Sequence, residues 1–364
     1  MLELDIKIPA MPEGGYPIRI GTDILGSLWP RIEADFDKYS KFVVTDENLV
    51  SAGHLQKLLG QRDIPAFTIS PAGEASKTID TAIAIIEAME KAYLGRDTLV
   101  VALGGGTVGD IAGFAAAVFK RGVPVLQIPT STVAQADSAV GGKTGVDSSM
   151  SKNAFGAFWH PAGVYIDTVI LKTLDERQFR AGLVESVKHA IIADSEYFDF
   201  LEENLDAVLQ RKPDVLEKIA ERNCRIKGSV VEADPREQNQ RRSLNYGHTI
   251  GHAVEAASGF ELLHGEAVAI GIIAAGLIEI EMELAQPGRL DRIRGILEKL
   301  GVPVKLPADM AEEKLIDLIK RDKKAVNKWP RFVLISRIGE VYRQDGQYAV
   351  EVSAELVTTV LQKL

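Results

Sequence analysis

Short apolar runs alternate with helical stretches in the first half of the chain, and this alternation restricts the possible folds more than any other feature. In chain order the runs are Lys41–Thr45, Ala66–Ile69, Thr98–Leu103, Val125–Ile128 and Val164–Ile166. Amphipathic segments such as Ile79–Leu94 lie between them. Since parallel strands need a crossover connection, usually a helix, this order predicts a parallel sheet covered on both faces. The alternating segment Met1–Pro9 predicts another strand rather than a signal peptide.

The pattern changes after about Thr168. Residues 172–300 show helical spacing throughout, interrupted by residues such as Pro213 and Pro287, and a short strand at Phe332–Ser336 and a helix at Ala354–Lys363 follow. A chain of 364 residues is also long for one simple core. We therefore predict an α/β, Rossmann-like N-terminal domain at 1–168 and a mainly α-helical C-terminal domain at 169–364.

Charge and cysteine content exclude several classes of protein. A formal net charge of -9 is unsuited to general binding of nucleic acid or of an anionic membrane surface, although a pocket can still be locally basic. The one cysteine, Cys224, rules out a disulfide framework within the chain. An apolar run of about 18 residues, as a membrane span needs, is not found. We expect a cytoplasmic protein with a small-molecule partner.

A glycine turn follows the run Thr98–Leu103 and opens a helix. The spacing Gly104-x-Gly106-x-x-Gly109, with Gly105 inside it, fits a dinucleotide fingerprint, in which backbone N–H groups approach a pyrophosphate. The alternative is an ordinary tight turn between a strand and a helix. The acid expected about twenty residues downstream is replaced by Lys120 and Arg121. Other strand ends supply candidates for the ribose contact, which can equally be turn or cap residues: Asp46, Asn48, Glu74 and Lys77.

Three of the six histidines fall in one stretch. His248 and His252 are four residues apart and share a helix face, and His264 begins another helix. This spacing is typical of metal ligands, although a single helical histidine is more often structural. A divalent metal also favours a carboxylate. Glu185 is the first candidate, and the alternative is an ordinary surface ion pair with Lys188. The competing carboxylates are Glu255 and Glu266.

Five segments spread along the chain resemble the 3-dehydroquinate synthase family. They are GGGTVGDIAGFAAAVFKRGV (104–123), QIPTSTVAQADSAVGGKTGVD (127–147), KNAFGAFWHP (152–161), AGLVESVKH (181–189) and LNYGHTIGHAVE with HGEAVAIG (244–271). The family's fold, an NAD-binding α/β domain followed by a helical domain, agrees with the pattern above. The resemblance also implies a homodimer.

The resemblance implies roles for individual residues. Glu185, His248 and His264 are expected to bind zinc or cobalt. The expected catalytic residues are Asp137, Lys143, Lys188, Arg241, Asn245 and His252, with His252 handling a proton. Further substrate contacts are expected from Arg121, Lys152, Asn153, Lys227 and Lys324. The residues expected to contact NAD are Gly104, Gly105, Gly106, Asp110, Thr130, Ser131, Lys143 and Lys152, with Asp46, Asn48, Glu74 and Lys77 towards its ribose and adenine.

The implied reaction converts 3-deoxy-D-arabino-heptulosonate 7-phosphate into 3-dehydroquinate and phosphate. It combines transient oxidation by NAD, phosphate elimination, reduction and an intramolecular aldol closure, so that NAD is regenerated. Basic side chains would offset the charge of the substrate phosphate and carboxylate, and a bound metal would act as a Lewis acid.

Other readings remain open at this point. The loop Asp147–Ser151 and His160 depart from the family pattern, which leaves room for a variant substrate. A sugar-phosphate cyclase that makes 2-deoxy-scyllo-inosose or a valiolone is the nearest alternative. Gly141-Gly142-Lys143-Thr144 and Arg241 favour the dehydroquinate reaction. A metal-dependent alcohol or glycerol dehydrogenase would not need so many basic residues, and a non-enzymatic NAD-binding protein would not need metal ligands.

Overall fold

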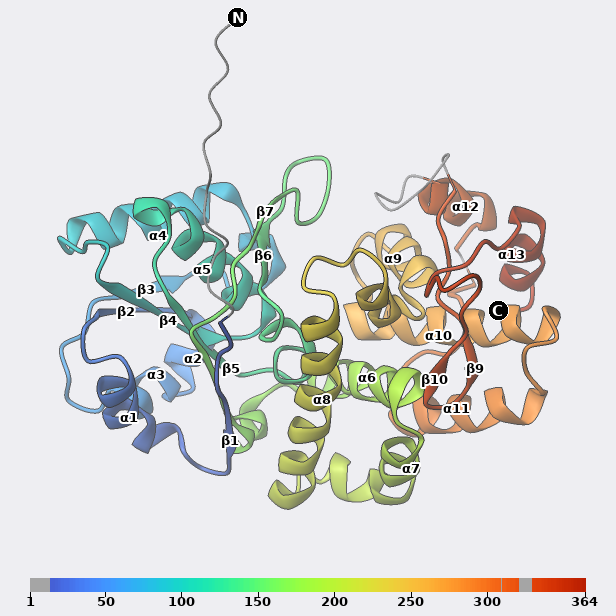
Figure 1. Cartoon of the computed structure of the whole chain (residues 1–364), viewed down its shortest axis with the longest axis horizontal. Helices are drawn as coiled ribbons and strands as arrows, with labels where there is room; N and C mark the ends of the chain where they lie inside the picture. Colours follow the sequence, from blue (N-terminus) through green and yellow to red (C-terminus); the bar gives the residue numbers. More distant parts are fainter. Residues whose placement is uncertain (1–13, 309, 321–328) are drawn as a thin grey trace, which may run out of the picture.

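The computed structural model describes residues 14–308, 310–320 and 329–364. The strand predicted at Met1–Pro9 and the predicted substrate contact Lys324 lie outside these residues. Figure 1 shows an N-terminal half built on a twisted sheet and a C-terminal half built mainly of helices, with α8 (Pro213–Ala233) and α6 (Glu176–Ala193) between them. This arrangement confirms the predicted fold class.

The main sheet has six strands in the order β1-β8-β5-β4-β2-β3, and every neighbouring pair is parallel. In that order the strands are Ile18–Gly21, Gly163–Asp167, Val125–Pro129, Thr98–Gly104, Ser40–Asp46 and Ala66–Ile69. The five predicted runs are all strands of this sheet. β1 was missed because four half-buried residues with an arginine among them carry too little periodic signal.

Both faces of the sheet are covered, as the apolar runs predict. Along β4, Leu99, Val101 and Leu103 belong to one core cluster. Val100 and Ala102 belong to another, on the opposite face, because successive side chains of a strand alternate. Helices α4 (Ile79–Lys91) and α5 (Gly106–Val118) cover the second face, and α1 (Leu28–Asp35) and α3 (His54–Leu59) cover the first.

The C-terminal half packs around one buried helix. Helix α10 (His264–Glu281) has apolar or small residues on every face and packs against α6, α9 (His248–Ala257), α11 (Pro287–Lys299) and α13 (Ala354–Leu361). Helix α7 (Ser195–Leu209) packs against α6 and α11, and α12 (Glu312–Lys320) packs against α9 and α13. The strand predicted at Phe332–Ser336 begins later than expected, at Ile335. It is β9 (Ile335–Arg337), which forms a hairpin with β10 (Glu340–Val341).

The two halves meet at the carboxyl edge of the sheet. There a short π-helix, η4 (Ala134–Ser138), is followed by a hairpin of β6 (Lys143–Val146) and β7 (Phe155–Phe158), which sequence analysis missed. Helix α6 packs tightly against this edge, since a Cβ on Gly182 would lie 1.9 Å from Thr132 Oγ1. Among the described residues, none of the helices is long and apolar enough to span a bilayer. The predicted division at 168/169 stays a prediction.

Candidate metal and nucleotide site

Glu185, His248 and His264 converge from three helices. Glu185 lies in the middle of α6, whereas His248 and His264 are the first residues of α9 and α10. Glu185 Oε1 is 3.8 Å from His248 Nε2 and 3.6 Å from His264 Nε2. This oxygen is buried without a hydrogen-bond partner, which is costly unless a cation or donor satisfies it. The donor set and the orphaned oxygen therefore fit a divalent metal.

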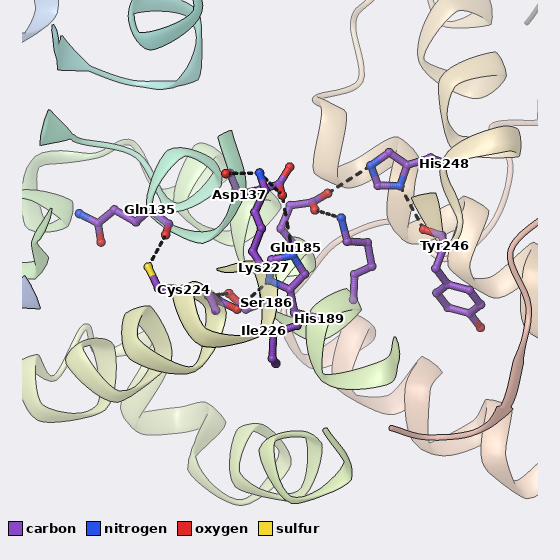
Figure 2. Close-up of polar contacts among 12 residues, drawn as sticks. Gln135, Asp137, Glu185, Ser186, His189, Cys224, Ile226, Lys227, Tyr246 and His248 are labelled. Atoms are coloured by element: carbon purple, nitrogen blue, oxygen red, sulfur yellow. Dashed lines mark hydrogen bonds and ion pairs between the residues drawn. The ribbon is translucent and has the colours of Figure 1, made fainter. Parts of the chain in front are cut away.

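The two histidines are held by their other ring nitrogens. His248 Nδ1 lies 3.0 Å from the carbonyl oxygen of Tyr246, so it donates and leaves the Nε2 lone pair towards Glu185 (Figure 2). His264 Nδ1 lies 3.3 Å from Glu255 Oε2. Such outer contacts fix the tautomer of metal-binding histidines. Burial lowers the pKa of His264, but the nearby negative charges of Glu185 and Glu255 raise it to about 9, so metal binding must displace a proton at lower pH.

The three candidate carboxylates differ in what they contact. Glu266 accepts two hydrogen bonds from Arg177, both 2.7 Å, and caps α10 through the Leu263 N–H. Glu255 is bound by Lys152 at 2.9 Å and by His264. Of the three, Glu185 keeps a buried oxygen without a partner, so it suits a metal best.

Lys188 pairs with Glu185, and both side chains are only 1% exposed. The alternative of an ordinary surface ion pair is therefore wrong. Burial alone would raise the pKa of Glu185, but Lys188 and the two histidines hold it well below its usual range. Glu185 is thus kept ionised inside the protein, as a metal-binding carboxylate requires.

Two more predicted cations are buried beside this cluster. Lys227 is 2.6 Å from Asp137 Oδ1 and also donates to the Asp137 carbonyl (Figure 2). Arg241, 1% exposed, donates to the carbonyl oxygens of Gly141 (2.8 Å) and Pro235 (2.7 Å). Burial lowers the pKa of Lys227 and acts against the raising effect of Asp137. Buried cations of this kind are suited to bind an anionic group in a site of low dielectric.

Glu237 was not singled out by sequence analysis, yet it contacts two predicted residues. Lys143 forms an ion pair with Glu237 Oε2, and Asn245 Nδ2 donates to Oε1 at 2.9 Å. The sequence signal is weak, because an acidic residue in a polar loop is usually a solvated surface charge. Asn245 precedes His248 by three residues, so this contact places the network next to the metal cluster.

The glycine turn joins β4 to α5, as predicted. The N-terminus of α5 has no side-chain cap, which leaves backbone N–H groups available for an anion. A Cβ on Gly105 would approach only the Ser131 side chain, at 3.4 Å. Thr130 follows β5 directly and donates its N–H to Gly104 O at 2.9 Å. Gly104, Gly105, Thr130 and Ser131 therefore lie together and fit a dinucleotide pyrophosphate.

Two of the four candidates for the ribose contact lie beside this turn. Glu74 accepts from Thr107 Oγ1 at 3.1 Å, and Lys77 pairs with Asp110 at 2.7 Å. Asp46 ends the neighbouring strand β2, and its side chain accepts a hydrogen bond from the Leu49 N–H at the start of α2 (Glu47–Ser51). Asp46 is therefore a helix cap, which was the alternative to a ribose contact. Asn48 lies in the first turn of the same helix.

Lys152 connects the nucleotide side to the metal side. Its ammonium is 3.2 Å from Glu74 and 2.9 Å from Glu255, whose other oxygen faces His264. Next to it, the Asn153 N–H donates to Asp147 at 2.6 Å within a loop closed by Ser148.

The remaining predicted residues are placed as follows. His252 is exposed, with its ring 5.3 Å from His248 and 5.8 Å from His264. His160 lies beside the hairpin, its ring 6.1 Å from Tyr16. Arg121 is exposed in η3 (Phe119–Arg121), at the C-terminal end of α5, whereas the glycine turn is at the N-terminal end. Arg121 therefore lies away from the glycine turn, and its contact with the substrate stays a prediction.

Comparisons with known proteins agree with this geometry. Residues 67–181 match the family described as 3-dehydroquinate synthase N-terminal, and residues 182–325 match 3-dehydroquinate synthase C-terminal. The 3-dehydroquinate synthase of Symbiobacterium thermophilum is 42% identical over 90% of this chain and 93% of its own length.

Two solved structures are also similar. A 2-epi-5-epi-valiolone synthase from Streptomyces hygroscopicus, with NAD⁺ and Zn²⁺ bound, has a TM-score of 0.87 and 26% identity, covering 98% of this chain and 99% of that one. A 2-deoxy-scyllo-inosose synthase complexed with carbaglucose-6-phosphate, NAD⁺ and Co²⁺ has a TM-score of 0.85 and 28% identity, covering 95% and 96%. Identity is clearly higher to the dehydroquinate synthases, and the chain belongs to the 3-dehydroquinate synthase family.

Proposed function

We propose that this chain is a 3-dehydroquinate synthase, which converts 3-deoxy-D-arabino-heptulosonate 7-phosphate into 3-dehydroquinate and phosphate. The observation that carries the proposal is a carboxylate and two histidines set among buried cations. Glu185, His248 and His264 form a metal-binding set, and Lys188, Lys227 and Arg241 are each at most 5% exposed beside it. A substrate that bears a carboxylate and a phosphate needs such cations, whereas an uncharged alcohol does not.

The cofactors follow from the same residues. Glu185, His248 and His264 would hold zinc or cobalt, since both metals accept this ligand set. The glycine turn, with Glu74, Lys77, Asp110, Thr130 and Ser131 around it, would hold NAD. When bound, NAD exchanges a hydride with the substrate and the metal supplies Lewis acidity.

The chain's own side chains bind, orient and move protons. Lys143, Lys152, Asn153 and Arg241 are proposed to bind the anionic groups of the substrate. Asp137, oriented by Lys227, would accept hydrogen bonds from substrate hydroxyls, and Lys188 would donate one. His252, which is exposed next to the cluster, would exchange a proton with a substrate oxygen or with water. Lys143 and Asn245 would have to exchange Glu237 for the substrate, because Glu237 contacts both of them in this structure.

The test is phosphate release from the heptulosonate phosphate, with catalytic NAD and either zinc or cobalt. We expect one phosphate per product, 3-dehydroquinate identified by mass and NMR, and no net NADH. Accumulating NADH without phosphate would point instead to a dehydrogenase. Turnover of sedoheptulose 7-phosphate or glucose 6-phosphate, with none of the heptulosonate, would point to another sugar-phosphate cyclase.

Assembly and location are further parts of the proposal. A homodimer is supported by Phe155 and Phe158, which are 46% and 49% exposed on strand β7. One chain has a mass of 39.6 kDa, and light scattering of the purified protein should give twice this value. We place the reaction in the cytoplasm, where cells keep NAD and phosphorylated intermediates, and cell fractionation checks this.

A further inference from the structure

Three buried polar atoms meet behind the proposed substrate site. They are Asp137 Oδ1, Glu185 Oε1 and His189 Nε2. Lys227 contacts the first of them at 2.6 Å, whereas the other two have no hydrogen-bond partner. Their ligand atoms lie within 4.8 Å of one another, and His189 Nε2 is 3.8 Å from Asp137 Oδ1. Figure 2 shows these side chains pointing towards one another from α6 and η4. Glu185 Oε1 faces the proposed metal position, whereas His189 has no role in the proposed reaction.

The charges around these atoms do not suit a second divalent cation. Lys188 pairs with Glu185, and Lys227 pairs with Asp137 at 2.6 Å, so each carboxylate already has its own ammonium group. Both lysines are buried, and a second dication between them would meet strong repulsion. His189 Nε2, 3.8 Å from Asp137 Oδ1, therefore faces that carboxylate through an electrostatic contact rather than as a metal ligand.

The ring of His189 is held through its other nitrogen, Nδ1. His189 is 0% exposed, and its Nδ1 lies 3.1 Å from the side-chain amide oxygen of Asn223. Asn223 Nδ2 donates to Ser186 Oγ at 2.9 Å, and Tyr197 OH donates to Asn223 Oδ1 at 3.2 Å. A lone pair on Nε2 would be repelled by the Asp137 carboxylate, so Nε2 carries the hydrogen.

We propose that His189, held by Asn223, is a positioning residue that fixes the Asp137 carboxylate for its contact with the substrate. Asp137 has a buried oxygen facing His189 and a side chain that is 29% exposed, so its other side can reach substrate. Without the Nε2–H, Asp137 is held on that side by Lys227 alone. This inference rests on the proposed function, in which Asp137 orients substrate hydroxyls.

The test compares His189→Gln with His189→Asn in the zinc-loaded, NAD-bound enzyme. The amide nitrogen of glutamine can take the place of Nε2, whereas that of asparagine reaches only the place of Nδ1. We expect His189→Asn to lower kcat by about 10- to 100-fold, as misplaced catalytic groups do, with little change in KM. His189→Gln should restore kcat to near the wild-type value. His54→Asn is the matched control, because His54 is also buried but contacts Thr173, at 2.6 Å, outside the site.

Two results would overturn the inference: equal kcat in His189→Asn and the wild type, or equal loss in both His189 variants with normal melting temperatures. If His189→Asn does not fold, Asn223→Ala replaces it, and an unchanged kcat there counts against the inference. If the wild type itself releases no phosphate, the proposed function fails. The inference is then decided by crystal structures, in which Asp137 should turn away from its wild-type position in His189→Asn but not in His189→Gln.

Discussion

Two fully buried glutamates in adjacent helices respond to burial in opposite ways. Glu185 in α6 has its pKa held well below the usual range, because Lys188, His264 and His248 outweigh its burial. Glu279 in α10 is raised by burial to a pKa of about 7, even though Arg289 acts against this. Both residues as a whole are 0% exposed.

The difference lies in what each carboxylate contacts. Glu279 uses one oxygen for the Ile335 N–H, at 2.8 Å, and the other for Arg289, at 2.5 Å, so it joins α10, α11 and β9 and has no oxygen left. Glu185 keeps Oε1 without a partner. Burial alone therefore does not mark a functional carboxylate, but a buried, ionised carboxylate with an unused oxygen does. Four predictions test this contrast.

The largest effect is expected at the metal cluster. His264→Ala should lose bound metal and nearly all turnover while the fold survives, because one of three ligands is removed. Metal content by mass spectrometry and circular dichroism check this. His252→Ala is the control, since it should keep stoichiometric metal. Full metal content and activity in His264→Ala would refute the ligand assignment.

The buried pair should matter for stability as well. Lys188→Met leaves Glu185 buried without its ammonium partner, and we expect a loss of about 3–5 kcal/mol in the free energy of unfolding. Urea denaturation of the metal-free proteins measures it. Arg225→Gln breaks the exposed pair with Glu221 and should cost at most about 0.5 kcal/mol. Similar losses in both variants would remove the contrast between buried and surface pairs.

Glu279 should make stability depend on pH. Its folded pKa is about 7 and its reference value is 4.5, so its contribution is fully present below pH 4.5 and is lost as pH rises through 7. Relative to Glu279→Gln, the wild type should lose about 3 kcal/mol between pH 4.5 and 8. Denaturation at several pH values gives this difference. A constant difference would show that Glu279 stays ionised throughout.

The smallest effect is expected one contact away from the metal. Glu255→Gln removes the charge that faces His264 Nδ1, and metal affinity should fall by about 10- to 100-fold. Competition with a chelator measures the affinity. Glu266→Gln serves as a comparison, because Glu266 binds Arg177 instead of a histidine. If both variants lose equal affinity, Glu255 acts only through the fold.

Sequence reasoning predicted the strands and the metal cluster better than the contacts between the halves. β4 and the glycine turn have strong local signals, and His248 and His264 stand out because three of the six histidines fall in one short stretch. In contrast, Lys152 meets Glu255 across 103 positions and Lys143 meets Glu237 across 94. No local pattern encodes such pairs, because they depend on how the halves pack. The hairpin β6–β7 was missed for a related reason, since Gly145 and Gly156 weaken a strand signal.

The close packing of α6 has a consequence for changes in chain length. Glu185, Lys188 and His189 share this helix, which touches Thr132 through Gly182 without an intervening side chain. One inserted residue would turn everything beyond it by about 100°. All three side chains would then point elsewhere at once. We expect insertions between Gly182 and Glu185 to abolish function, and insertions in the loop 147–151 to be tolerated.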